Sequence, residues 1–137
     1  MTDFNQATLD ELTQRAVEAA RNSYSRYSGF SVGAALKLSN GEIVAGTNVE
    51  NASYGLTICA ERSALVSAVS QFGPQIRVEA VVVVNLNNAP SPPCGACRQV
   101  LSEFMLPDAP ITFPGINGVR TMKFSELMPE SFELKTR

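Results

Sequence analysis

All three cysteines of the 137-residue chain lie in two short segments, and they constrain the fold more than any other feature. The segments are residues 57–62 (Thr-Ile-Cys-Ala-Glu-Arg) and 92–99 (Pro-Pro-Cys-Gly-Ala-Cys-Arg-Gln). Cys94 and Cys97 are one helical turn apart, so their sulfurs can converge on one ion, and Cys59 can add a third ligand from the start of the preceding helix. A fold that uses this pattern must bring the two helix starts together.

A site with these three ligands is typical of catalytic rather than structural zinc. Three protein ligands leave one tetrahedral position open, whereas structural zinc usually has four. The chain has no histidine, so a fourth ligand would have to be a carboxylate or come from a partner chain, and histidine-based catalysis is excluded. Glu61 lies two residues after Cys59, within reach of a water on the metal. We predict one Zn²⁺ per subunit, with Glu61 as proton shuttle.

Three thiolates leave the zinc site formally at minus one, which weakens its pull on a water proton. Both helix N-termini direct partial positive charge at the cysteines, and Arg62 lies three residues after Cys59. We therefore predict that Arg62 donates hydrogen bonds to a thiolate and tunes the metal rather than contacting substrate.

Other interpretations fit each segment alone. A single Cys-x-x-Cys can be a redox pair or a structural half-site, and a buried cysteine is an ordinary small core residue. A zinc site that only stabilises an oligomer is a further alternative. The occurrence of both segments, each at a predicted helix start and together containing every cysteine, favours zinc catalysis.

The secondary structure is predicted from periodicity and turn signals. Thr8 with Glu11 forms a capping box, and Asn40-Gly41 indicates a tight hairpin. The predicted helices are 8–22, 59–72, 94–105 and 125–128, and the predicted strands are 30–38, 43–49, 76–85, 111–113 and 119–123. We expect an α/β fold, a three-layer α-β-α sandwich with a mixed five-stranded sheet, in one domain spanning 1–137.

Charge and hydropathy exclude several partners. The net charge is -2 and the pI about 5.1, and lysines and arginines are scattered singly, which disfavours polymeric nucleic acid as substrate. The longest apolar run, Ala80–Val84, is far below the ~20 residues that span a bilayer, and the N-terminus does not have the pattern of a signal peptide. We expect a soluble, cytoplasmic protein without membrane contacts.

Both cysteine segments, together with Tyr27–Ala35 and Asn48–Tyr54, resemble the small homotetrameric zinc-dependent cytidine deaminases, and the resemblance runs from about Ser23 through Phe104. The cysteines follow the three-cysteine variant of the zinc deaminase signature. The resemblance implies a cytidine deaminase-like fold and a homotetramer. It also implies hydrolytic deamination of cytidine and 2′-deoxycytidine to uridine and 2′-deoxyuridine plus ammonia, in pyrimidine salvage.

The resemblance also implies substrate contacts. Phe30 would pack on the pyrimidine, Asn48 and Glu50 would hydrogen-bond the ribose hydroxyls, and the backbone at Ala60 would contact the amide edge of the base. An aromatic face suits a planar base, and a neighbouring amide and carboxylate suit a hydroxyl. Without the resemblance, Phe30 would be taken as a core residue and the other two as an ordinary strand end.

Three further positions depend on the resemblance. The family commonly has proline where this chain has Ser31, Tyr54 is a weaker candidate for lining the site or a subunit contact, and Phe132 could close a neighbouring subunit's site. A deaminase of a modified or antibiotic cytosine nucleoside stays open as an alternative substrate class. The sequence does not distinguish cytidine from 2′-deoxycytidine.

Overall fold

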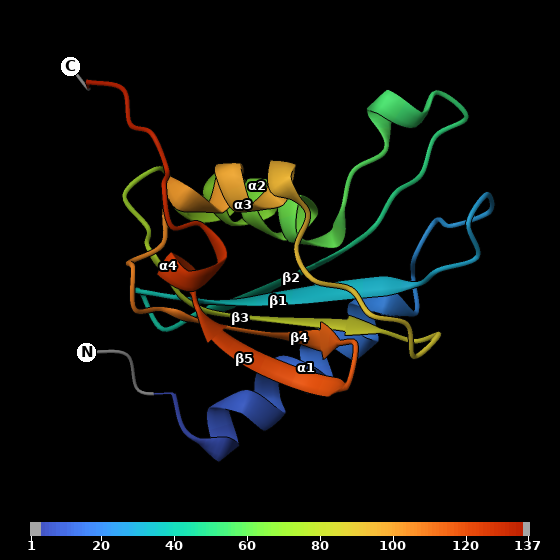
Figure 1. Cartoon of the computed structure of the whole chain (residues 1–137), viewed down its shortest axis with the longest axis horizontal. Helices are drawn as coiled ribbons and strands as arrows, with labels where there is room; N and C mark the ends of the chain where they lie inside the picture. The colour runs from blue at the N-terminus through green and yellow to red at the C-terminus, as the bar shows by residue number, and fades with distance from the viewer. Residues whose placement is uncertain (1–3, 136–137) are drawn as a thin grey trace.

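The computed structural model describes residues 4–135 and contains a five-stranded sheet with helices on both faces (Figure 1). Its strands lie in the order β2-β1-β3-β4-β5, with β3 and β4 parallel and the other neighbouring pairs antiparallel. The elements are α1 (Gln6–Ala20), β1 (Val32–Leu38), β2 (Ile43–Thr47), η1 (Tyr54–Leu56), α2 (Ala60–Phe72), β3 (Val78–Asn85), α3 (Gly95–Ser102), β4 (Pro110–Gly115), β5 (Gly118–Lys123) and α4 (Phe124–Leu127). The predicted mixed α/β sheet and the order of its main elements are confirmed.

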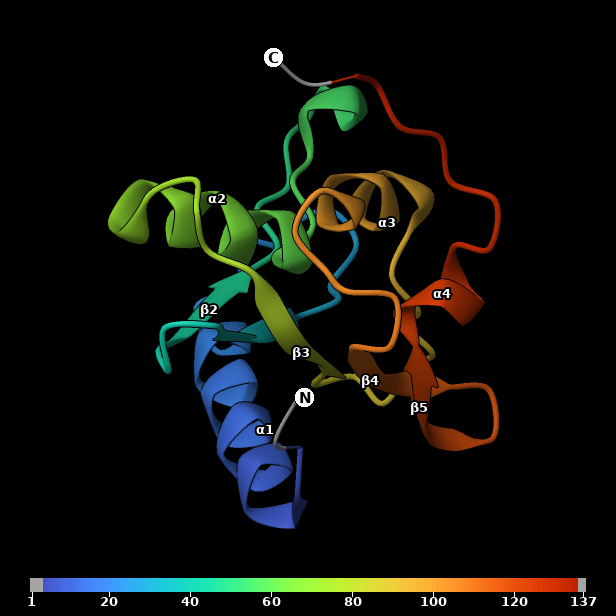
Figure 2. The ribbon, with the colours of Figure 1, turned by 90° about the vertical axis from the view of Figure 1, so that its left-hand side faces the viewer.

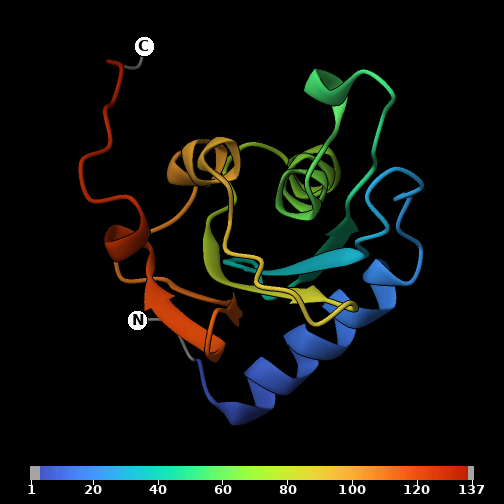
Figure 3. The same ribbon diagram turned by 45° about the vertical axis from the view of Figure 1, so that its right-hand side comes forward.

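Three layers follow from the alternation of buried side chains. Helix α1 packs on one face of the sheet, and α2 and α3 lie next to each other on the opposite face (Figure 3). Along β3, Val82 joins the core beneath α1, whereas Val81 and Val83 join the larger core beneath α2 and α3. The valine run is therefore buried on both faces, as its lack of polar alternation predicts.

Two glycines, one on the edge strand β2 and one on its neighbour β1, let the helices lie very close to the sheet. A Cβ at Gly46 on β2 would be 2.4 Å from the backbone nitrogen of Ala64 on α2, and a Cβ at Gly33 on β1 would be 1.9 Å from the backbone oxygen of Ala16 on α1. Because these neighbours are backbone atoms, a side chain cannot be accommodated without moving a helix. The position of α2, whose N-terminus carries Cys59, depends directly on Gly46.

The capping box predicted at Thr8 is wrong. Helix α1 begins two residues earlier, and the side chain of Asn5 is the N-cap, accepting a hydrogen bond of 2.9 Å from the Thr8 backbone N–H. Asparagine is at least as good an N-cap as threonine, so the earlier start gives the helix a capped N-terminus and adds helical residues.

Other boundaries differ by a few residues. Strand β1 begins at Val32 rather than at residue 30, and α3 ends at Ser102 rather than at 105. The short helix η1 was not predicted. Among residues 4–135, no helix is long and apolar enough to cross a membrane. The C-terminal tail leaves α4 and passes outside α3 (Figure 2).

Candidate metal centre

The three cysteines meet where α2 and α3 begin. Cys59 is the N-cap of α2, Cys94 is the N-cap of α3, and Cys97 lies in the first turn of α3. Their sulfur atoms all lie within 4.8 Å of one another, and the Sγ atoms of Cys59 and Cys94 are 3.7 Å apart. Sulfurs on one tetrahedral zinc, with Zn–S bonds of about 2.3 Å, would be about 3.8 Å apart. The donor set and its spacing fit Zn²⁺.

The protonation of the cysteines is also consistent with a cation site. A hydrogen bond from Cys97, with help from Arg62 and Cys94, lowers the pKa of the Cys59 thiol to about 5. The same hydrogen bond to Cys59, together with burial, raises the pKa of the Cys97 thiol. The protein alone therefore stabilises one negative charge and opposes a second. A divalent ion between the sulfurs removes that opposition, since thiolates are the form that binds zinc.

Glu61 lies in the first turn of α2, directly beside this cluster. Its side chain is only 4% exposed. Burial, followed by the negative charge at Cys59, raises the pKa of the carboxyl to about 7. A carboxyl in such a position can hold and release a proton near neutral pH.

Arg62 contacts the Cys59 sulfur and does not line the cavity described next. Its Nη2 donates hydrogen bonds to the Thr57 carbonyl at 3.1 Å and to the Cys59 sulfur at 3.8 Å. Its Nε is buried without a partner among the described residues. The guanidinium is thus placed against a sulfur, as the sequence predicts, but its influence on the metal is untested.

A cavity of about 230 Å³ opens next to the cysteines. Its lining includes two of the cysteines together with Asn48, Ala60 and Glu61, which were predicted from the sequence as site residues. Its lining is Val32, Asn48, Thr57, Cys59, Ala60, Glu61, Val83, Ser91, Pro92 and Cys94. Thr57 and Pro92 lie in the cysteine segments and could have been suspected. Val32 lies in the segment Tyr27–Ala35 that carries the resemblance. Val83 and Ser91 carry no signal in the sequence, because their place depends on the strand order.

Asn48 is 8% exposed, and its side chain holds the neighbouring backbone at the cavity wall. Its Oδ1 accepts hydrogen bonds from the Val32 N–H at 3.0 Å and the Ser23 hydroxyl at 2.6 Å, and its Nδ2 donates to the Phe30 carbonyl at 2.9 Å. An amide nitrogen carries two N–H groups. One of them is left to contact a ligand.

Phe30 and Glu50 are not part of the cavity lining. Phe30 is 46% exposed, so it is not the core residue that the sequence without the resemblance would suggest. Hydrogen bonds from Ser28, from both its hydroxyl and its backbone, and from the Tyr27 backbone lower the pKa of Glu50. Glu50 lines a separate hollow of about 370 Å³, and Thr57 belongs to both spaces.

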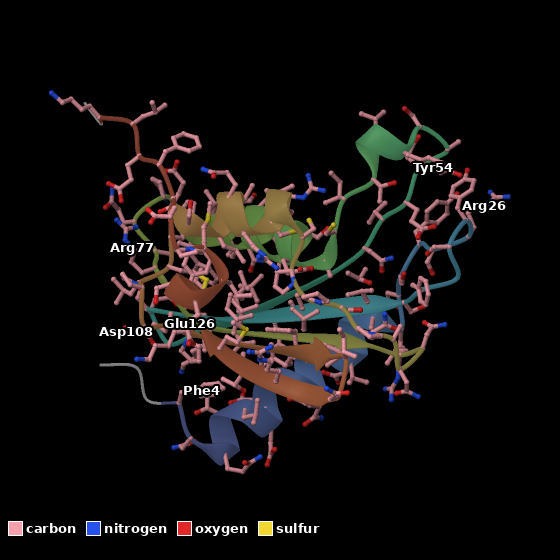
Figure 4. The ribbon with its side chains drawn as sticks, viewed as in Figure 1. Phe4, Arg26, Tyr54, Arg77, Asp108 and Glu126 are labelled. Carbon is pink, nitrogen blue, oxygen red and sulfur yellow. The ribbon has the colours of Figure 1, made fainter. Side chains whose placement is uncertain are left out.

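The remaining two candidates are at opposite ends of the molecule. Tyr54 lies on η1, is 80% exposed and lines the same hollow as Glu50. Figure 4 labels it at the tip of the loops on the right, near Arg26. Phe132 is 65% exposed and lies in the C-terminal tail, in a groove with Ser102 and Glu103 of the α3 end.

Comparison with known proteins identifies the family. Residues 6–112 match the family described as the cytidine and deoxycytidylate deaminase zinc-binding region. The chain belongs to this family. A cytidine deaminase of Halalkalibacterium halodurans is 43% identical over 122 residues, which cover 88% of this chain and 91% of that relative. Family membership and the cysteine cluster together make zinc the cofactor of this zinc-dependent enzyme.

Solved structures of the family share the fold. The cytidine deaminase from Mycobacterium leprae superimposes with a TM-score of 0.78 at 41% identity, covering 93% of this chain and 100% of that one. The cytidine deaminase from Burkholderia pseudomallei gives a TM-score of 0.79 at 40% identity, and the match covers 90% of this chain and 98% of that one. This chain therefore has the same α/β sandwich fold as those two cytidine deaminases.

Proposed function

We propose that the chain catalyses the hydrolytic deamination of cytidine and 2′-deoxycytidine to uridine and 2′-deoxyuridine, releasing one ammonia for each water consumed. One observation carries this proposal: the buried carboxyl of Glu61 lines the same cavity as two sulfurs of the cysteine cluster. A structural zinc site does not need such a group. The relatives that are named cytidine deaminases, at 40–43% identity over most of the chain, support the same substrate class.

Cys59, Cys94 and Cys97 hold the zinc in this proposal. When bound, the ion supplies a Lewis acid that makes water nucleophilic near neutral pH. Glu61 would take a proton from the attacking water and deliver it to the ring nitrogen of cytosine. It would then take the second proton, from the hydroxyl group formed by the attack, and deliver it to the departing amine, so that one water supplies both protons. Its burial, at 4% exposure, keeps bulk water from competing for these transfers.

The size of the cavity suggests how the nucleoside lies. At about 230 Å³ it is smaller than the roughly 300–1,000 Å³ of most small-molecule sites. We infer that it takes the base alone, with the backbone of Ala60 on the amide edge, and that the sugar lies at the mouth. There the free N–H of Asn48 would donate to a ribose hydroxyl.

Two residues outside the cavity lining complete the proposed substrate contacts. Phe30 would cover a face of the pyrimidine, and Glu50 would accept a hydrogen bond from ribose. Both Glu50 oxygens accept hydrogen bonds from residues 27 and 28, so binding of a sugar hydroxyl would share or replace the one from the Ser28 hydroxyl. Arg62 does not line the cavity; its proposed role is to withdraw charge from the Cys59 sulfur.

A substrate panel tests this function. Zinc-loaded protein is incubated with cytidine, 2′-deoxycytidine, a sugar-modified cytosine nucleoside and a cytosine-rich single-stranded oligonucleotide, and ammonia is compared with product. We expect turnover of both free nucleosides with one ammonia each, independent of salt. Turnover of the modified nucleoside alone would favour the antibiotic-type alternative, and no turnover despite bound zinc would favour a non-catalytic zinc-stabilised oligomer. Salt-sensitive editing of the oligonucleotide would contradict the proposed substrate class.

We also propose a homotetramer, which is supported by exposed apolar side chains on the surface around the site. Several large apolar side chains are exposed there, on the loops around the site: Tyr24, Tyr27, Phe30, Val49, Tyr54, Leu56 and Ile58. Such a patch is typical of an interface. Phe132 is available to a neighbouring site, because its tail lies at the far end from η1 (Figure 1). Sedimentation that shows a stable, active monomer would contradict this assembly.

The cellular setting is proposed on chemical grounds. The three cysteines are free thiols, and they stay available for zinc in the reducing cytoplasm. We propose that residues 1–137 act there as one catalytic domain in pyrimidine salvage. Zinc-dependent activity in a cytosolic fraction, and its loss when the gene is removed, would test this placement.

A further inference from the structure

Two asparagine side chains hold the backbone on both sides of Phe30. Asn87 accepts a hydrogen bond from the Ser31 N–H at 2.9 Å and donates one to the Gly29 carbonyl at 2.9 Å. Asn48 accepts from the Val32 N–H and donates to the Phe30 carbonyl. Residues 29–32 are thus held by side chains from two other segments, in addition to the backbone hydrogen bond from Leu86 to Ser31 and the pairing of Val32 with Asn85.

Asn87 is itself held in place by the turn that follows β3. Its backbone N–H donates to Asn85 Oδ1 at 2.8 Å, and Asn85 Nδ2 donates to the Ser91 hydroxyl at 2.8 Å. Ser91 lines the cavity that contains Glu61. The loop that carries Phe30 is therefore connected through Asn87 to the cavity wall that leads to Cys94.

Packing alone does not hold Phe30, because its side chain is 46% exposed. The hydrogen bond from residue 31 to Asn87 needs a backbone N–H, which Ser31 has and a proline at this position would not have. In this chain, the asparagine amide can provide the rigidity that a proline ring would otherwise give the turn.

We propose that Asn87 is a positioning residue for substrate binding: by holding the backbone at Gly29 and Ser31, it sets the Phe30 ring at the mouth of the cavity for stacking on the pyrimidine. This inference rests on the proposed function of the cavity. Asn87 itself contacts neither the substrate nor the zinc. It acts by reducing the conformational freedom that Phe30 would lose when the nucleoside binds.

The Asn87→Ala variant tests the proposal. We expect the KM for cytidine to rise about tenfold, because two neutral hydrogen bonds at an exposed site are lost, while kcat stays within about twofold and zinc content is unchanged. Asn87→Asp keeps an acceptor for the Ser31 N–H but loses the donor to the Gly29 carbonyl. Its KM should therefore lie between the KM of wild type and that of Asn87→Ala. Asn88→Gly is the matched control: it alters the same turn, and glycine adopts the φ of 57° at that position.

Two further measurements separate positioning from a general structural effect. In a Phe30→Ala background, Asn87→Ala should raise KM no further, since the two residues act through one contact. Hydrogen exchange of the peptide covering residues 29–32 should be faster in Asn87→Ala than in wild type, with exchange in α2 unchanged.

The outcomes are distinct. Unchanged exchange at 29–32, an unchanged KM, or an additive effect in the Phe30→Ala background would each overturn the role of Asn87. Faster exchange at 29–32 with a raised KM that vanishes in the Phe30→Ala background supports it. A wild-type protein that does not turn over cytidine would instead contradict the proposed function, whatever the exchange data show.

Discussion

Replacing Gly46 with alanine should damage the metal centre through a single backbone contact. The added Cβ would lie 2.4 Å from the Ala64 nitrogen, whereas ordinary contact begins near 3.4 Å, so α2 must move by about 1 Å. Overpacking of this kind costs about 1–3 kcal/mol of unfolding free energy. A displacement of about 1 Å at reacting groups can lower turnover about 100-fold. Because α2 carries Glu61 and begins at Cys59, both zinc affinity and turnover should fall.

The assay compares Gly46→Ala with Leu12→Ala. Leu12 is fully buried on the opposite face, beneath α1, and its truncation should cost about 2–5 kcal/mol without moving a zinc ligand. Unfolding in urea, zinc affinity by chelator competition, and cytidine turnover are measured where both variants are folded. Gly46→Ala should lose turnover and zinc affinity, and Leu12→Ala should lose stability only. Equal turnover in Gly46→Ala and wild type, or equal loss of turnover in both variants, would show that the contact at Gly46 does not position the metal centre.

Two more predictions concern the zinc itself. Arg62→Gln removes the hydrogen bond to the Cys59 sulfur and should weaken zinc binding about 10-fold or more; a chelator competition that gives the wild-type affinity would show that Arg62 does not tune the site. Removal of zinc by a strong chelator should lower the urea midpoint of unfolding, and added Zn²⁺ should restore it, because ion binding adds to folding free energy. An unchanged midpoint would mean that the cluster binds no metal.

The metal centre could be predicted from sequence because its geometry is local. Cys94 and Cys97 are one helical turn apart, and Glu61 follows Cys59 within one turn, so helix periodicity alone places each pair. Helix starts could be recognised from neighbouring residues. The three cysteines are free thiols. If all three bind one ion, the N-termini of α2 and α3 must lie next to each other.

The rest of the cavity could not be predicted in this way. Val32 and Ser91 reach the cavity only through the strand order β2-β1-β3-β4-β5, which depends on long-range pairing rather than on local pattern. Asn87 looks like ordinary turn material, and its two hydrogen bonds to the Phe30 loop cross 56 and 58 residues. The wrong helix start has a simpler cause: Asn5 and Thr8 are both good caps, and only the folded chain decides between them.

Replacing Glu61 with glutamine, and measuring bound zinc and cytidine turnover in the same sample, tests the proposed mechanism most directly. Glutamine keeps the size of the side chain but cannot carry the proton, so turnover should fall by about 10²–10⁴-fold while zinc stays at the wild-type level. Glu18→Gln, an exposed change on α1, should leave both unchanged. If Glu61→Gln deaminated cytidine as fast as wild type, with zinc bound, Glu61 would not be the proton shuttle and the proposed mechanism would be wrong.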